Sequence, residues 1–319
     1  MVHAEPQAPS RAAGANRVVR PKAPRSQGGA YVLLLPAMVL FTVFTFIPIV
    51  WSIILSFENY NIFSNTATYV GFHNYAALLH SATFYQSLAA TAYYTFGSVP
   101  ITVALALFLA VLLNRRGLVG AKVFQMIFFL PYIVSSVGAS LVWKWMFDTN
   151  FGIINAFLGF FGIHPIAWLT QTSTAMPALI IMTIWGGVGF AVVLFQAGLR
   201  AVPSELTEAA AIDGATGNQI FWRITFPLLA PTTLFVLVIS IINAAQVFTT
   251  VQVMTAGGPL NATNVIVYYI YQEAFQFFNM GYGAAVAIVL FIIILALTAV
   301  MMLGSRRFVY YEGETRDDH

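Results

Sequence analysis

Uncharged polar side chains interrupt one of the longest hydrophobic stretches of the sequence, residues 228–248. Asn243 and Gln246 lie three residues apart and Thr250 follows four residues later, so a continuous helix would carry all three on one face. Amides in an apolar environment are costly unless they meet a polar partner or a wet cavity. The spacing therefore predicts either hydrogen bonds to neighbouring helices or a lining that suits a neutral, hydroxyl-rich ligand.

A second candidate is the segment 183–190, which reads Thr-Ile-Trp-Gly-Gly-Val-Gly-Phe. Its three glycines, beside Trp185 and Phe190, would form a notch with aromatic walls. Small residues are also the usual means of close packing between membrane helices. The sequence leaves both interpretations open.

The connection formed by residues 200–227 holds a third candidate, this time for contact with another protein. Pro203, Ser204 and Glu205 resemble a helix start with Ser204 as N-cap. Helical spacing continues through Glu205, Glu208, Ala209 and Ile212. Gly214 and Gly217 then predict a break, followed by a second short helix over residues 218–224. The small side chains of residues 209–211 would let this element pack into a groove on a partner, although a solvated connector between two helices is the simpler alternative.

The sequence lacks the residues that several other kinds of site need. The absence of cysteine excludes disulfides, cysteine-ligated metals and thiol catalysis. A nucleotide-binding loop requires Gly directly before Lys, but the three lysines follow Pro21, Ala121 and Trp143. No metal site is predicted, because the histidines share no ligand spacing: His3, His73, His80, His164 and His319. No catalytic residue is predicted either.

The elements that must position these candidates are membrane helices. Only 8% of the residues are charged, against about a quarter in soluble proteins, and the mean hydropathy is +0.81. About 20 residues of helix cross the hydrocarbon core. The fold class predicted is an all-α polytopic membrane protein, with six uncharged spans at residues 31–57, 88–113, 123–143, 176–199, 228–248 and 284–303. Ionisable groups inside spans would indicate an ion-coupled carrier or a voltage sensor, and these spans contain none.

Basic residues alternate between the connections. Apart from Lys144, every Lys and Arg lies in the N-terminal tail, the second or fourth connection, or the C-terminal tail. The positive-inside rule therefore places both termini in the cytoplasm. Residues 1–28 are predicted to be a disordered basic tail that lies near anionic lipid rather than nucleic acid. Residues 29–308 form the helical domain, and residues 309–319 a second cytoplasmic tail.

The connection 200–227 resembles the EAA loop of permease subunits of binding-protein-dependent ABC importers. That pattern is Glu-Ala-Ala, three residues, Gly, nine residues, Ile, one residue and Leu-Pro. The matching positions here are Glu208-Ala209-Ala210, Gly214, Ile224 and Phe226-Pro227, with Phe226 in place of Leu as the only departure. The segments AGLRAVPSEL (197–206), IDGAT (212–216) and MTAGGP (254–259) are similar to the sugar branch of this family. The resemblance covers about residues 30–308.

This resemblance implies the type I ABC importer permease fold and a non-catalytic subunit in the cell membrane. Its partners would be a homologous second permease, two ATP-binding subunits that hold ATP and Mg, and an extracytoplasmic solute-binding protein. The chain itself would bind no cofactor. The implied contact with the ATP-binding subunit, in which Glu208 pairs with a cation, comprises Ser204, Glu205, Glu208, Ala209, Ala210, Asp213, Gly214 and Phe221. The implied solute-lining positions are Thr183, Gly187, Phe190, Asn243, Gln246 and Phe248.

For the solute, the resemblance suggests a di- or oligosaccharide of the maltose or trehalose kind. Glycerol 3-phosphate or a glycerophosphodiester is the alternative, and the lack of a basic residue in the spans favours the neutral sugar. Two other classes of function remain open. One is a stand-alone channel or secondary carrier, and the other is a membrane scaffold whose polar side chains bind only neighbouring helices.

Overall fold

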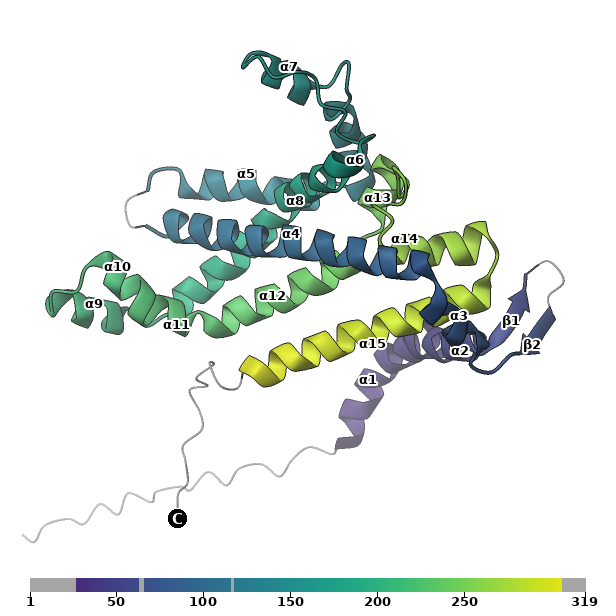
Figure 1. Ribbon diagram of the computed structural model, residues 1–319. Coiled ribbons are helices and arrows are strands. Elements are labelled where there is room, and N and C mark those ends of the chain that lie inside the picture. The colour runs from purple at the N-terminus through teal and green to yellow at the C-terminus, as the bar shows by residue number, and fades with distance from the viewer. Residues whose placement is uncertain (1–26, 63–65, 116–117, 306–319) are drawn as a thin grey trace, which may run out of the picture. The chain divides into compact units, whose positions relative to one another are not determined.

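The computed structural model describes residues 27–62, 66–115 and 118–305 (Figure 1). The predicted C-terminal tail and residues 1–26 of the predicted N-terminal tail lie outside the described residues. The chain divides into two parts, Met1–Trp51 and Ser52–His319. Each part is described by itself.

The described portion of the first part is a hydrophobic helix. It comprises α1 (Gln27–Phe41), a π-helical turn η1 (Thr42–Phe46) and the start of α2 (Ile47–Ser56). Leu33–Ser56 is 24 residues long and apolar enough to cross a membrane, which agrees with the first predicted span. The Thr42 hydroxyl donates to the carbonyl of Met38 at 2.8 Å, so its polar group is satisfied within the helix.

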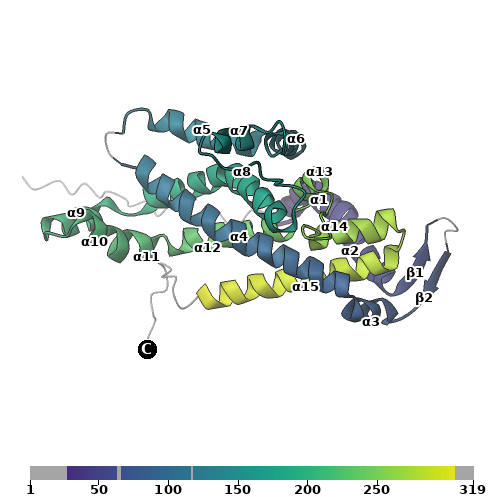
Figure 2. The same ribbon diagram turned by 45° about the horizontal axis from the view of Figure 1, so that its top comes forward.

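Three helices form the centre of the second part: α4 (Ala82–Leu113), α8 (Thr172–Ala201) and α12 (Ala230–Ala245). They lie side by side in both views (Figures 1 and 2). The core between them includes the fully buried Ala106 and Phe195, because small side chains let helix backbones approach while large ones fill the remaining space.

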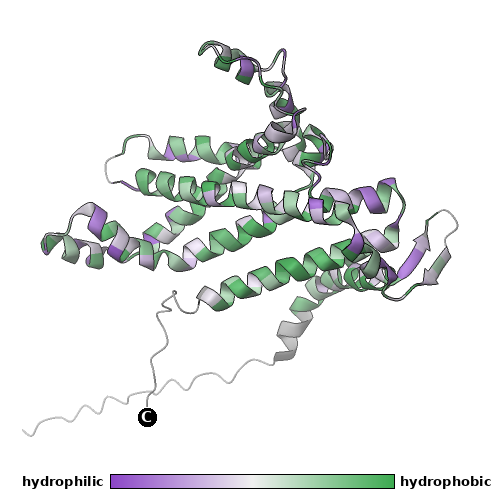
Figure 3. Cartoon of the chain, viewed as in Figure 1, coloured by the Kyte–Doolittle hydropathy of each residue, from purple (hydrophilic) through white to green (hydrophobic). Residues whose placement is uncertain are grey.

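The last helix, α15 (Met280–Ser305), is hydrophobic along nearly its whole length (Figure 3). Together with Leu33–Ser56, α4 and α8, it is one of four helices in the described residues that are long and apolar enough to span a membrane. Two bent helix pairs raise the number of candidate spans to as many as six. The all-helical, polytopic class is therefore confirmed.

The third predicted span is not one continuous helix, and on this point the prediction was wrong. It consists of α5 (Ala121–Ile133) and α6 (Ser136–Met146), which are bent by 97°. The break falls at Val134 and Ser135, whose ψ angles of 141° and 126° are extended. Serine is favoured at the start of a helix, so Ser135 suits the beginning of α6.

The fifth span is also broken. The segment Gly217–Leu228 meets α12 at 63°. At its other end α12 stops at Ala245, with Gln246 as the C-cap residue, and Thr250 lies in a new helix, α13 (Thr249–Met254). The single helical face predicted for Asn243, Gln246 and Thr250 is therefore wrong.

Short elements fill the connections. They include the helix α3 (His73–His80), and the helix α14 (Ile266–Tyr271) that continues into η3 (Gln272–Gln276). An antiparallel hairpin of β1 (Glu58–Asn61) and β2 (Thr66–Tyr69) was not predicted. It adds one small sheet to the otherwise helical chain.

Candidate functional site

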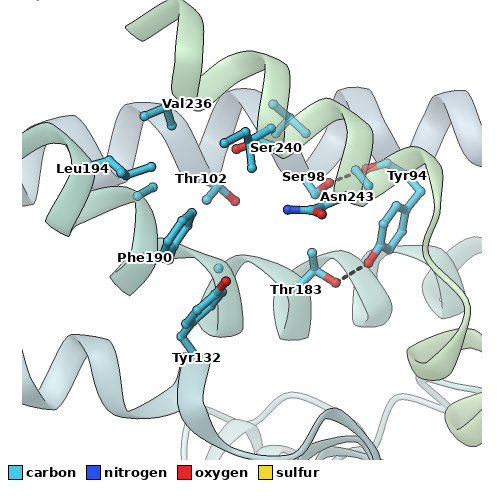
Figure 4. Close-up of a pocket in the computed structure, with 15 residues that line it drawn as sticks. Tyr94, Ser98, Thr102, Tyr132, Thr183, Phe190, Leu194, Val236, Ser240 and Asn243 are labelled. Atoms are coloured by element: carbon cyan, nitrogen blue, oxygen red, sulfur yellow. Dashed lines mark hydrogen bonds between the residues drawn. The ribbon is translucent and has the colours of Figure 1, made fainter. Parts of the chain in front are cut away.

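A cavity lies between α4, α8 and α12, and Tyr132 of α5 borders it (Figure 4). Its volume of about 120 Å³ leaves room for several water molecules, each of which needs at least about 10–15 Å³. None of the described residues that line it is charged. The members with hydrogen-bonding side chains are Tyr94, Ser98, Thr102, Tyr132, Thr183, Ser240 and Asn243.

Hydrogen bonds within the protein already occupy some of these hydroxyls. The Thr183 hydroxyl donates to the carbonyl of Leu179 at 3.0 Å, so the Tyr94 hydroxyl, which also bonds to it, must be the donor of that pair. Ser98 donates to the carbonyl of Tyr94 at 2.7 Å. No hydrogen bond to another described residue is found for the amide of Asn243, which is left able to bind a guest molecule (Figure 4).

The opposite wall of the cavity is aromatic and aliphatic. The rings of Tyr132 and Phe190 stack with centroids 4.7 Å apart and an interplanar angle of 12°, and Leu194 and Val236 extend this surface. The cavity therefore combines uncharged hydrogen-bonding groups with ring faces. This combination suits a molecule that has both hydroxyl groups and apolar C–H surfaces.

The glycines of segment 183–190 have different roles. A Cβ on Gly189 would lie 1.9 Å from the carbonyl oxygen of Phe128 in α5, so this glycine permits close packing of two helices. Gly187 lines the cavity, and a Cβ there would make only an ordinary contact of 3.7 Å with Thr102. Gly189 thus serves helix packing, while Gly187 lies at the cavity.

Of the six solute-lining positions predicted, Thr183, Gly187, Phe190 and Asn243 come together around this cavity. Gln246 and Phe248 are not among the residues that line it. Phe248 instead packs on the rings of Tyr268 and Tyr271, with centroids 6.2 and 5.2 Å away.

Sequence reasoning missed the contribution of α4 to the cavity. Tyr94, Ser98 and Thr102 recur every four residues within a predicted span. That spacing puts three hydroxyls on one helical face, so the signal was present in the sequence.

The predicted partner-binding loop consists of α9 (Ser204–Ile212), α10 (Gly217–Ile220), η2 (Phe221–Thr225) and α11 (Phe226–Leu228). Pro203 rather than Ser204 occupies the N-cap position of α9. Asp213 caps its C-terminus, and Gly214 follows with a φ of +83°, a left-handed conformation that glycine adopts readily at helix ends. The predicted break at this glycine is confirmed.

The second short helix begins one residue earlier than predicted, so Gly217 starts a helix and does not interrupt one. Thr216 caps it, because its hydroxyl accepts from the amide of Gln219 while the Gln219 side chain accepts from the amide of Thr216 at 2.8 Å. This reciprocal pair is a capping box. It fixes the turn between α9 and α10.

The surface of this loop is open. No residue of α9 is buried, and the apolar side chain of Ile212 is 86% exposed. Leu206 and Trp222 are exposed as well. A hollow of about 410 Å³ lies beside the helix, with Ser204 and Glu208 in its wall. Exposed apolar groups on a loop between membrane helices are typical of a surface that another protein covers.

Residues 75–309 match the model of a protein family described as "Binding-protein-dependent transport system inner membrane component". The chain belongs to this family. Its members are the permease subunits of ABC importers, so this permease serves transport across a membrane rather than catalysis, and the type I fold implied by the EAA-like loop is confirmed.

Named relatives cover nearly the whole permease. The sn-glycerol-3-phosphate transport system permease protein UgpA of Agrobacterium fabrum is 33% identical, over 88% of this chain and 96% of the relative. The trehalose/maltose transport system permease protein MalF of Thermococcus litoralis is also 33% identical, over 86% of this chain and 93% of the relative. A crystal structure of a bacterial ABC transporter involved in alginate import matches with a TM-score of 0.79 and 25% identity, over 89% of this chain and 97% of that chain.

Proposed function

We propose that this permease translocates a neutral di- or oligosaccharide of the trehalose or maltose type. The observation that carries the proposal is the uncharged cavity between α4, α8 and α12, with hydroxyl and amide groups on one side and stacked rings on the other. The relative named for trehalose and maltose transport supports the same solute class.

Each part of the cavity has a role in this proposal. The Asn243 amide donates to and accepts from sugar hydroxyls, as do the hydroxyls of Thr102 and Ser240. The face of the Tyr132–Phe190 pair receives the C–H surface of a sugar ring. Thr183 and Gly187 shape the wall between them.

A glycerol phosphate or its diester is the second candidate, because the relative named for glycerol 3-phosphate is equally similar. A phosphate group is usually bound by Arg or Lys through charge-assisted hydrogen bonds. The described lining of this cavity offers neither, so the neutral sugar is favoured.

The energy for uphill transport comes from partner subunits in this proposal. A homologous second permease completes the pathway, two ATP-binding subunits hold ATP and Mg, and an extracytoplasmic binding protein delivers the solute. Both termini lie in the cytoplasm. Residues Ser204–Phe221 transmit closure of the ATP-binding subunits to the spans, with Glu208 paired to a cation on the partner and the rest of the contact formed by Glu205, Ala209, Ala210, Asp213 and Gly214.

The decisive experiment is uptake by the assembled importer in proteoliposomes. Radiolabelled maltose, trehalose, longer neutral oligosaccharides and glycerol 3-phosphate are compared, with and without ATP and the binding protein. We expect ATP-dependent uptake of a neutral sugar. Uptake of only the phosphate ester would select the second candidate. Flux through the permease alone would show a channel or carrier, and failure to co-purify with an ATPase would favour a scaffold.

A further inference from the structure

Between α6 and α8 the chain forms a small lobe, defined here as residues 148–171, which contains α7 (Ile153–Gly159). Figures 1 and 2 show α7 away from α12, and in Figure 1 it extends beyond α6. Asp148, at the beginning of this outer lobe, is its only charged residue, and residues 149–199 contain no Asp, Glu, Lys or Arg.

The polar group at the centre of the outer lobe is turned inward, whereas Asn150, His164, Thr170 and Gln171 are exposed. Asn155 is only 7% exposed and joins both ends of the lobe. Its Nδ2 donates to the carbonyls of Thr149 and Ile166 at 3.1 and 2.8 Å. Its Oδ1 accepts from the amide of Ile166 and from the Trp168 indole at 3.2 and 3.0 Å. The lobe is therefore folded around one amide whose hydrogen bonds stay inside the protein.

The charged carboxylate of Asp148, at the base of the lobe, is also hydrogen-bonded within the protein. The Asp148 carboxylate accepts from the amides of Asn150 and Phe151 at 2.8 and 2.9 Å. The amide of Phe151, followed by that of Asn150, holds the pKa of this carboxyl below its usual value.

Large apolar side chains form the outside of the lobe. Phe160 is 88% exposed and Phe151 is 80% exposed. The remaining members of this outward-facing set are Ile153, Phe157, Phe161 and Ile163. A surface loop in water has the opposite arrangement, with polar groups outside. An outside dominated by Phe and Ile around an internally bonded amide is the arrangement expected of a segment in contact with an apolar medium.

We propose that the outer lobe is a lipid anchor, with its exposed Phe and Ile side chains inserted among the acyl chains of the bilayer. The lobe continues the apolar surface of α6, where Leu141 and Trp145 are exposed. Because α6 is bent by 97° from α5, and α5 packs along the candidate span α8, α6 leads the chain sideways from the spans, in the direction of the membrane plane. A helix in that orientation with an apolar face and a basic residue, here Lys144, is typical of interfacial segments.

A soluble partner fits this surface less well than lipid. Protein interfaces have a polar rim around their apolar centre, and charged groups on both sides steer the encounter. The outer lobe has no charged side chain except Asp148, and backbone amides already occupy that carboxylate.

The test uses the natural absence of cysteine from this chain. Phe157→Cys and Phe160→Cys are spin-labelled in the assembled importer, made with cysteine-free partners, in nanodiscs of phosphatidylcholine and phosphatidylglycerol. Collisions with oxygen, which concentrates in the bilayer, are compared with collisions with a water-soluble nickel chelate. Leu295→Cys on the hydrophobic α15 is the lipid control, and Ala67→Cys on the exposed β2 is the water control.

We expect the oxygen-to-nickel ratio at Phe157 and Phe160 to approach that at Leu295, several-fold above that at Ala67. A ratio equal to that at Ala67 would overturn the proposal. So would a label that collides with neither reagent, since this indicates packing against another subunit. Addition of solute-loaded binding protein should leave the spectra unchanged, and immobilisation of either label would show that the lobe docks that protein instead. None of these outcomes depends on which solute is carried.

Discussion

At the scale of single residues, Asn243 offers the most direct test of whether the cavity binds solute. It lines the cavity, whereas Gln246, three residues later at the end of α12, does not. Removal of the Asn243 amide would leave sugar hydroxyls without partners, at about 1–3 kcal/mol. We therefore expect Asn243→Ala to weaken the apparent affinity for solute by roughly tenfold or more, measured as solute-dependent uptake by the assembled importer.

Gln246→Ala is the matched control, because it removes the same amide group from a position outside the lining. We expect transport kinetics close to those of the unmodified protein. Equal losses in both variants would show that the cavity between α4, α8 and α12 does not determine binding.

Asn155 is the second residue that can be tested alone, through its contribution to the stability of the outer lobe. Asn155→Ala would leave the Trp168 indole and both backbone polar groups of Ile166 without their side-chain partner. Unsatisfied buried groups cost about 1–3 kcal/mol each. We expect faster amide hydrogen exchange across residues 148–171, measured by mass spectrometry. The control is Asn150→Ala, since only the backbone of that exposed residue bonds to Asp148, and its exchange should stay unchanged.

At the scale of helices, the close contact between α5 and α8 depends on the absence of a side chain at Gly189. Gly189→Ala would place a Cβ against the backbone of Phe128, which cannot rotate away. Overpacking of this kind costs about 1–3 kcal/mol, so the thermal midpoint of the purified importer should fall by several degrees. Gly186→Ala, in the same helix with nothing within 4 Å, should leave the midpoint within error. A normal midpoint for Gly189→Ala would mean that α5 does not approach α8 so closely.

The same scale shows why some elements could be predicted and others could not. Hydropathy alone locates the spans, because a bilayer core excludes charge over about 20 residues. The break at Val134–Ser135 has no such signal, since both of its flanks are apolar and its 97° bend arises from two backbone angles. Hydropathy also gives no sign that α12 ends at Ala245. The prediction that Gln246 shares a helical face with Asn243 was wrong because it assumed an unbroken helix.

The cavity could be predicted only in part, for a related reason. Residue types suitable for a neutral solute are visible in α8 and α12, and the four-residue spacing of Tyr94, Ser98 and Thr102 is visible in α4. Which of these faces meet is a property of tertiary packing. Tyr132 illustrates this most clearly, because it belongs to α5, which the sequence did not connect with the cavity, yet it lines the cavity and stacks on Phe190 of α8.

At the scale of the whole molecule, the proposed solute site and the proposed partner surface are separated along the same helices. Figure 1 shows α9 and α10 beyond the ends of α8 and α12. The cavity lies farther along those helices, at Gly187 and Asn243. Two of the helices that line the cavity, α8 and α12, thus also support the exposed loop. Movement of α9 by a partner can therefore reach the cavity directly through α8, and through α10, η2 and α11 to α12.

Charge reversal at Glu208 tests this mechanical link. Glu208 lies in the wall of the hollow beside α9, and we expect Glu208→Lys to abolish uptake while the variant still inserts in the membrane. Loss of the proposed pair with a cation on the ATP-binding subunit, about 1–3 kcal/mol, and the repulsion that replaces it would uncouple solute uptake from ATP hydrolysis. The readout is stimulation of ATPase activity by solute-loaded binding protein, with co-purification of the ATP-binding subunits as the measure of assembly. Glu208→Gln keeps the shape and removes only the charge, so an intermediate loss is expected. If Glu208→Lys instead transports at the normal rate, α9 is only a connector, and the force must enter the permease elsewhere.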